Sequence, residues 1–170
     1  MMRRDTLAFQ ALTSLARLRG GIDDKRCHLV FELLCAGDAI HAAIQRQLAA
    51  KGLNELRLNV LSVLFVNDPA PITPADLAYH ANVTRSAMTD AIDSLEKHGL
   101  VVRNRDKRDR RMIDICLTEE GSRTVDSTLE GYLHLLGKLA SDVEMSEQPA
   151  LMAILRKLQA GTAALLSANS

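Results

Sequence analysis

The sequence predicts a mainly α-helical protein with one small β-hairpin, and three observations lead to this fold class. The chain of 170 residues is 47% hydrophobic but only 3% aromatic and holds no Trp, so we expect a core made mainly of Leu, Ala, Ile and Val, which favours helices. Apolar residues recur at helical spacing over most of the chain. The alternation of apolar and polar residues that is typical of strands occurs in one short region, residues 100–117.

The first third of the chain is predicted to form helices. A glycine pair at 20–21 separates an amphipathic segment, residues 7–18, from a long periodic segment, residues 24–51, which Gly52 ends. The long segment would extend for about 42 Å at helical rise, which is more than one small domain needs and indicates a partner. A further helix is expected over 55–66, where the loop "NDPAP" ends it.

Two shorter helices with a tight turn between them follow. Thr73 has the position and side chain of a helix N-cap, and its helix is expected to reach about His80. Ala81 and Asn82 make a turn, and Thr84 caps the next helix, which ends at Gly99.

The predicted hairpin concentrates the positive charge of a chain whose formal net charge is zero. Its strands are residues 100–103 and 112–117, and the tip between them is "RNRDKRDRR", with six cationic side chains and two aspartates. Residues 97–111 hold seven Lys or Arg against two Asp, whereas residues 118–150 hold seven acids against two bases. This distribution would orient the protein on a polyanion while limiting non-specific affinity.

Two further helices complete the chain. Thr118 caps the first, which has acids in its opening turn and an apolar stripe extending to Val143, and the second begins near Pro149. The centre of the chain is therefore helix, turn, helix and hairpin. This order is typical of a winged helix-turn-helix, in which the second helix presents its first turn to the major groove and the hairpin is the wing.

Other classes of protein find little support in the sequence. Cys27, Cys35 and Cys116 are odd in number and widely spaced, which indicates neither a disulfide framework nor a zinc knuckle, and His28 and His41 do not have ligand spacing. The sequence also lacks a nucleophile elbow, a phosphate-cradling glycine loop and a metalloprotease motif. We therefore expect no metal, no cofactor and no enzymatic activity.

No membrane segment is expected either. No uninterrupted apolar stretch of about 18 residues occurs. Residues 7–16 are the one candidate for a secretory signal, and polar residues such as Gln10 and Thr13 interrupt them. A cytoplasmic protein is therefore expected.

The central residues resemble a known family. Residues 72–121, "ITPADLAYHANVTRSAMTDAIDSLEKHGLVVRNRDKRDRRMIDICLTEEG", strongly resemble the winged helix-turn-helix core of the MarR family of bacterial transcriptional regulators. The resemblance covers the helix-turn-helix, the "LEKHGLV" junction, the "DKRDRR" wing and the "LTEEG" start of the next helix. It implies a winged core at residues 53–118 between dimerisation helices at 1–52 and 119–170.

The resemblance also implies a function. The expected protein is a sequence-specific, DNA-binding transcriptional regulator, in the form of a homodimeric repressor that a small aromatic or phenolic ligand releases from its operator. The family binds such ligands in a cleft between the dimer helices and the DNA-binding lobe. Two copies would place their recognition helices about 34 Å apart on double-stranded DNA and read a pseudo-palindrome.

Candidate DNA-binding residues begin at the start of the recognition helix. They are Thr84, Arg85, Ser86, Thr89 and Asp90. An arginine can hydrogen-bond guanine with two donors, and hydroxyls can serve bases or phosphates. Asp90 departs from the family pattern, because a carboxylate repels phosphate unless it accepts from cytosine or pairs with Arg85. Asn82 stands where relatives frequently have glycine, and asparagine tolerates the left-handed conformation.

The wing supplies a second set of candidates. Those for phosphate contact or for insertion into the minor groove are Arg105, Lys107, Arg108, Arg110 and Arg111. Asp109 and Arg111 match the acid and arginine that shape the hairpin in the family. We expect Asp109 to hold an arginine through a charge-assisted pair.

Two alternatives to a ligand-released repressor remain open. A reactive thiol at Cys27 or Cys35 would make the protein a redox-sensing regulator of the same fold, although a buried cysteine that acts as a small hydrophobe is the commoner case. A winged-helix module that only associates with proteins would agree with the neutral net charge and with Asp90. The arginine-rich wing argues against it.

Overall fold

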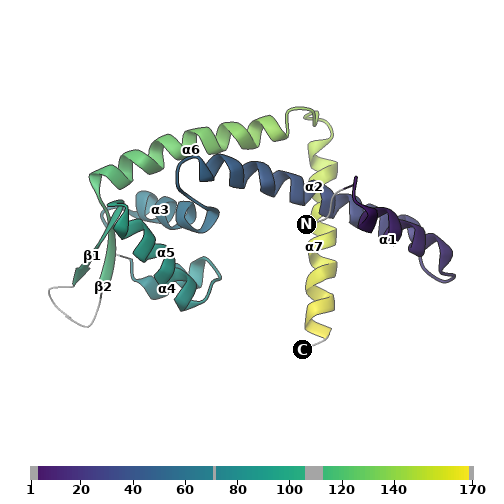
Figure 1. Ribbon diagram of the computed structural model, residues 1–170, viewed down its shortest axis with the longest axis horizontal. Coiled ribbons are helices and arrows are strands. Elements are labelled where there is room, and N and C mark those ends of the chain that lie inside the picture. Colours follow the sequence, from purple (N-terminus) through teal and green to yellow (C-terminus); the bar gives the residue numbers. More distant parts are fainter. Residues whose placement is uncertain (1–3, 71, 106–112, 169–170) are drawn as a thin grey trace. The chain divides into compact units, whose positions relative to one another are not determined.

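The computed structural model describes residues 4–70, 72–105 and 113–168 and confirms the predicted fold class (Figure 1). Helices dominate, and the described strands form one two-stranded antiparallel sheet. In chain order, the elements are α1 (Leu7–Leu18), α2 (Asp24–Ala49), α3 (Glu55–Asn67), α4 (Pro74–His80), α5 (Arg85–Lys97), β1 (Val101–Arg105), β2 (Ile113–Leu117), α6 (Glu119–Leu139) and α7 (Gln148–Ala168).

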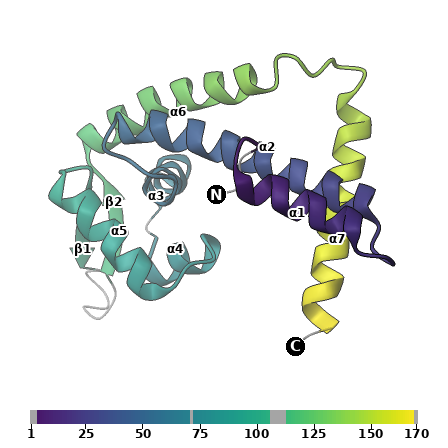
Figure 2. The same ribbon diagram turned by 45° about the vertical axis from the view of Figure 1, so that its right-hand side comes forward.

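The chain divides into two compact units, Met1–Leu133 and His134–Ser170. In the first unit, α3, α4, α5 and the hairpin gather at the carboxyl end of α2, while α1 lies along the other half of α2 (Figures 1 and 2). The boundaries predicted at residues 52 and 118 separate dimerisation helices from a DNA-binding core. The compact units do not test that functional division, which stays a prediction.

The core of the first unit holds the recognition region together. Apolar side chains from the end of α2, from α3, α5, both strands and the start of α6 are almost fully buried there. They are Leu48, Val60, Leu61, Met88, Ile92, Leu95, Val101, Ile115 and Val125. Burial of a side chain of this size contributes about 1.5–3 kcal/mol, so α5 and the hairpin share one rigid base.

The sheet has an extra contact that the alternation pattern does not predict. Val101 pairs with Leu117 and Arg105 with Ile113 at the two ends of the ladder. On the other edge of β2, Ile72 forms a bridge to Ile115, whose N–H donates to the carbonyl of Ile72 at 3.0 Å. The segment before α4 therefore anchors the helix-turn-helix to the wing.

The start of α6 is fastened to the root of the hairpin. Thr118 donates from its N–H to the carbonyl of Leu100 at 3.1 Å and from Oγ1 to the carbonyl of Gly99 at 2.6 Å. Its Oγ1 also accepts from the N–H of Gly121 at 2.9 Å, which makes Thr118 the predicted N-cap. Gly121 lies so close to Leu100 that a Cβ would overlap the carbonyl oxygen of that residue.

The N-terminal helices expose many apolar side chains. Phe9 packs its buried ring against Phe31 and His28 of α2 and so attaches α1 to α2. The exposed apolar residues of the two helices include Leu7, Leu12, Leu15, Leu18, Leu29, Val30, Leu33, Leu34 and Ile40.

Within the described residues, α2 alone is long and apolar enough to cross a membrane by length and composition. Glu32 and Asp38 lie in its middle part, and an aspartate at the bilayer centre costs about 2.5–3.5 kcal/mol on insertion scales. We therefore interpret the exposed apolar surface of α2 as a surface for a protein partner.

The helix predicted to continue through Val143 ends earlier. The last residue of α6 is Leu139, and the N–H groups of Ala140, Ser141 and Val143 each bond to the carbonyl three residues before. Such tight turns close a helix rather than extend it. The second unit continues with α7, where Pro149 lies in the first turn as predicted.

Candidate nucleic-acid interface

The first turn of α5 is presented to solvent by a cap on one side and an apolar face on the other. The Oγ1 of Thr84 accepts from the N–H of Ala87 at 3.2 Å, which fixes where the helix begins. The inner face packs into the core through Met88, Ala91, Ile92 and Leu95. All five candidates on this helix are exposed as a result, namely Thr84, Arg85, Ser86, Thr89 and Asp90.

The turn before α5 has the conformation that the sequence predicts. Asn82 adopts φ +51°, in the left-handed region. The N–H of Asn82 donates to the carbonyl of Tyr79 at 3.1 Å, and the N–H of Val83 donates to that of Ala78 at 3.1 Å. At the other end of α4, the Oγ1 of Thr73 accepts from the N–H of Asp76 at 3.2 Å. These bonds hold α4 and α5 in a helix-turn-helix.

The polar groups on the exposed turn differ in their readiness to bind. Thr89 donates its hydroxyl to the carbonyl of Arg85 at 2.9 Å, which leaves the oxygen lone pairs for a donor. Throughout the described part of the chain, no ion pair involves Arg85 or Asp90. The pairing of these two residues, one of two ways to explain an acid at this position, is therefore absent from the structure.

Sequence reasoning missed a link between the recognition helix and the wing. Arg103 of β1 donates to Asp93 at 2.5 Å and also to Glu96, both on α5. Burial acts to lower the pKa of the Arg103 guanidinium, but the hydrogen bond to Asp93 and the charges of Glu96 and Asp93 raise that pKa above its ordinary value. In the sequence, the only indication of this link is that two acids three residues apart, Asp93 and Glu96, are followed by an arginine, Arg103.

The wing tip lies outside the described residues. This applies to Lys107, Arg108, Asp109, Arg110 and Arg111, and to the side chain of Arg105. Their roles in phosphate contact, and that of Asp109 in bracing the hairpin, stay predictions.

A basic cavity lies at the far end of α5. Its volume is about 200 Å³, and it is lined by the loop between α2 and α3, the start of α3, the end of α5 and part of α6. Lys51, Arg57 and His98 contribute nitrogen groups, beside an apolar wall that includes Leu53 and Leu95. Arg57 donates from Nη1 to the carbonyl of Gly52, while its buried Nε has no partner in the structure as described.

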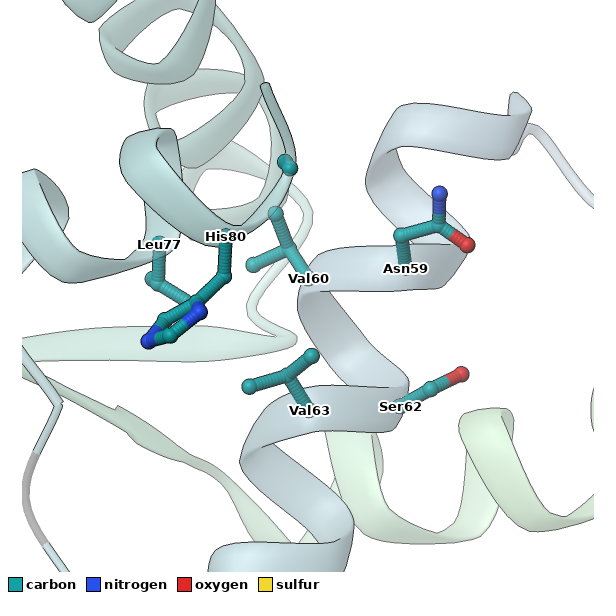
Figure 3. A pocket seen from close by; sticks show the side chains of 7 residues that line it. Asn59, Val60, Ser62, Val63, Leu77 and His80 are labelled. Carbon is teal, nitrogen blue, oxygen red and sulfur yellow. The ribbon is translucent and has the colours of Figure 1, made fainter. Parts of the chain in front are cut away.

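A second cavity, of about 220 Å³, separates α3 from α4. Figure 3 shows Val60 and Val63 of α3 facing Leu77 and His80 of α4, with Asn59 directed to the other side of α3. The walls of this cavity are mostly apolar, and His80 is the aromatic side chain among the residues that line it.

The cysteines are free and half-buried. Burial, reinforced by the charge of Glu32, raises the pKa of the Cys35 thiol above its ordinary value. A raised pKa leaves less thiolate at neutral pH, which is the opposite of what a peroxide-sensing cysteine needs. Among the residues that the structure describes, no group of three His, Cys, Asp or Glu side chains is placed to hold a metal ion.

Comparisons with known proteins agree with this geometry. Residues 53–113 match the sequence model of the MarR family. The chain is 25% identical over 150 residues to the HTH-type transcriptional repressor YetL of Bacillus subtilis, and the match covers 88% of this chain and 90% of YetL. Relatives of the chain by sequence are named as transcriptional regulators or repressors.

Solved structures show the same fold. The crystal structure of YusO from Bacillus subtilis superposes with a TM-score of 0.65 and 25% identity, and it covers 81% of this chain and 96% of YusO. CouR from Rhodococcus jostii, crystallised with p-coumaroyl-CoA bound, has a TM-score of 0.61 and 26% identity over 76% of this chain and 90% of CouR.

Proposed function

Residues 53–113 match the MarR family, and on that premise we propose that the chain is a homodimeric repressor of this family that binds a pseudo-palindromic operator and is released by a small-molecule ligand. One observation carries the DNA-binding part. Five adjacent polar positions at the capped start of α5 are exposed together, on a helix whose other face is buried in the core that also holds the wing. This arrangement suits reading of base edges in the major groove.

Within this proposal, the residues have separate tasks. Arg85 reads a guanine, because its guanidinium is exposed and without an ion pair in the described structure. Thr84, Ser86 and Thr89 offer hydroxyl groups to bases or phosphates. Asp90 accepts from a cytosine amino group, since it does not pair with Arg85. The wing residues Arg105, Lys107, Arg108, Arg110 and Arg111 neutralise phosphates or enter the minor groove.

Exposed apolar surface supports the homodimer. Long helices on both sides of the DNA-binding region expose Leu, Val and Ile side chains, among them Leu33 of α2 and Ile154 of α7. Large exposed apolar surfaces mark protein interaction sites. A second copy would cover it and place the two α5 helices one turn of DNA apart, about 34 Å. Sedimentation of a pure monomer at micromolar concentration would rule this out.

The basic cavity supports a ligand with an acidic group. Lys51, Arg57 and His98 can pair with a carboxylate or phenolate, and the apolar wall can hold one aromatic ring. A volume of about 200 Å³ suits such a ring, since a cavity of about 150 Å³ accepts benzene. His98 is the C-cap of α5, so a ligand that moves this residue also moves the recognition helix. CouR was crystallised with p-coumaroyl-CoA bound. For this chain, the residues of the basic cavity favour a ligand with one aromatic ring and an acidic group.

A DNA-binding titration tests the main proposal. Fluorescence anisotropy with the DNA upstream of the protein's own gene should show binding that weakens as salt rises. The Arg85→Ala variant should lose about 1–3 kcal/mol of discrimination between operator and random DNA. Arg123→Ala is the matched control, because it removes an exposed arginine that pairs with Glu119 and Glu120 on α6. Absence of any binding at low salt would favour the alternative, a winged-helix module for protein association.

A further inference from the structure

Arg103 joins two parts of the proposed DNA-binding surface. It lies in the middle of β1, opposite Ile115 of β2, and its guanidinium reaches across to α5, where it pairs with Asp93 and Glu96. The side chain of Arg103 is only 27% exposed. Asp93 and Glu96 are 57% and 40% exposed, but an arginine that reaches two acceptors from a partly buried position has a more defined geometry than a typical surface ion pair.

The position of this pair on each element matters. Side chains two residues apart on a strand point to the same face, so Arg103 shares a face of β1 with Val101, which is buried in the core. The root of the wing is thus attached to α5 by packing at Val101 and by charge at Arg103. On α5, the partners Asp93 and Glu96 occupy the second half of the helix, whereas the proposed reading residues occupy its N-cap and first two turns.

Two explanations for the pair make opposite forecasts. If Arg103 only masks the acids, it reduces their repulsion of DNA phosphate, and neutral residues in place of Asp93 and Glu96 would improve binding. If the pair sets the angle between wing and helix, the same replacement would weaken binding even though it makes the protein more positive. The fixed two-acceptor geometry and the partial burial favour the second explanation.

We propose that Arg103 is a positioning residue, which holds the wing at the angle that lets wing and recognition helix contact DNA simultaneously. The inference rests on the proposed DNA-binding function and assigns Arg103 no contact with DNA. Its partners Asp93 and Glu96 serve that geometry and carry no base specificity. Sequence specificity stays with the N-cap and first two turns of α5.

The decisive variant is Asp93→Asn combined with Glu96→Gln in the full-length protein. We expect its affinity for the operator DNA to fall about tenfold, which corresponds to the loss of one or two phosphate contacts. The plot of log K against log salt should become less steep, with a slope smaller in magnitude by about 1–2. The matched control is Glu119→Gln combined with Glu120→Gln. It makes the same change in charge at an exposed pair with Arg123 on α6 and should not reduce the affinity or the slope.

Two further variants protect the test against loss of folding. Arg103→Lys keeps the charge but loses the fork, and it should reduce affinity and slope in the same direction with the thermal midpoint nearly unchanged. Arg103→Glu combined with Asp93→Arg reverses the pair at constant net charge. This variant should bind operator DNA more tightly than the single variant Arg103→Glu, in which no cation pairs with Asp93. Hydroxyl-radical footprints should keep the protection made by α5 and lose the flanking protection made by the wing.

The outcomes separate cleanly. If the wild-type protein binds and the double-neutral variant binds equally or more tightly, Arg103 only masks charge and the inference is overturned. If the wild-type protein itself fails to bind DNA at low salt, the proposed DNA-binding function is wrong, and the positioning role that rests on it is rejected with it. Reduced affinity with an unchanged salt slope and an intact wing footprint would also contradict a positioning role.

Discussion

Gly121 allows two backbones to approach each other where α6 starts. A Cβ at this position would overlap the carbonyl oxygen of Leu100 and lie 2.9 Å from its carbonyl carbon. The helix cannot retreat freely, because Thr118 is bonded to the carbonyls of Gly99 and Leu100. Ordinary contacts need about 3.5 Å, so a Gly121→Ala variant requires a movement on the order of 1 Å.

The cost of that movement can be worked from the same contacts. Overpacking in a tight site costs about 1–3 kcal/mol, and weakening of the two Thr118 bonds adds about 0.5–1.5 kcal/mol each. The greater helix propensity of alanine returns about 1 kcal/mol. We therefore expect Gly121→Ala to lower the free energy of unfolding by about 3 kcal/mol, or the thermal midpoint by about 6–12 °C for a chain of this length.

Gly137→Ala provides the matched control. It lies on the same helix, and a Cβ there would meet no atom within 4 Å in the described structure, so its stability should be unchanged or rise by up to about 1 kcal/mol. Thermal unfolding followed by circular dichroism measures both variants. A Gly121→Ala protein as stable as the wild type would refute the proposed close approach between α6 and the hairpin.

Three other predictions follow from local chemistry. Thr84→Ala removes the cap of α5 and should reduce the free energy of unfolding by about 1 kcal/mol in chemical denaturation, whereas Thr84→Ser should be nearly neutral. Because the pKa of Cys35 is raised, its thiolate forms only as pH climbs above the ordinary value, so site-resolved alkylation should be slow at pH 7 and accelerate at higher pH than for a model thiol; rapid reaction at pH 7 would revive the redox-sensing alternative. Arg108→Ala and Arg111→Ala should each weaken operator binding with little effect on thermal stability, and equal affinity in both would remove the wing from the interface.

The sequence predicts the helix-turn-helix closely because local signals determine its boundaries. Thr73 and Thr84 act as the predicted N-caps, and Asn82 takes the left-handed conformation of the predicted turn. Each of these features depends on residues within about four positions of each other. The apolar stripe of α5 is equally local, since its spacing alone indicates which side is buried.

Contacts between distant segments could not be predicted in the same way. The bridge between Ile72 and Ile115 joins residues that are far apart in the sequence. The residues around Ile72 do not indicate that Ile115 is its partner, and those around Ile115 do not indicate Ile72. The glycine in "LTEEG" is required by the carbonyl of Leu100, which comes close only after the hairpin has folded. Arg103 belongs to a charge cluster that predicts phosphate contact, yet its partners are acids on α5. The three-dimensional arrangement changes the interpretation of each.

The acids on α5 therefore have two separate roles. Asp93 and Glu96 share one arginine, Arg103, so one of their two negative charges is compensated, whereas Asp90 has no ion pair in the described residues and lies in the part of α5 proposed to read bases. An uncompensated carboxylate lowers affinity for every sequence through phosphate repulsion and recovers that loss only where a cytosine amino group faces it. In a chain of zero formal net charge, we expect this to increase the ratio of specific to non-specific binding, which is the quantity that decides occupancy when competing sites are abundant.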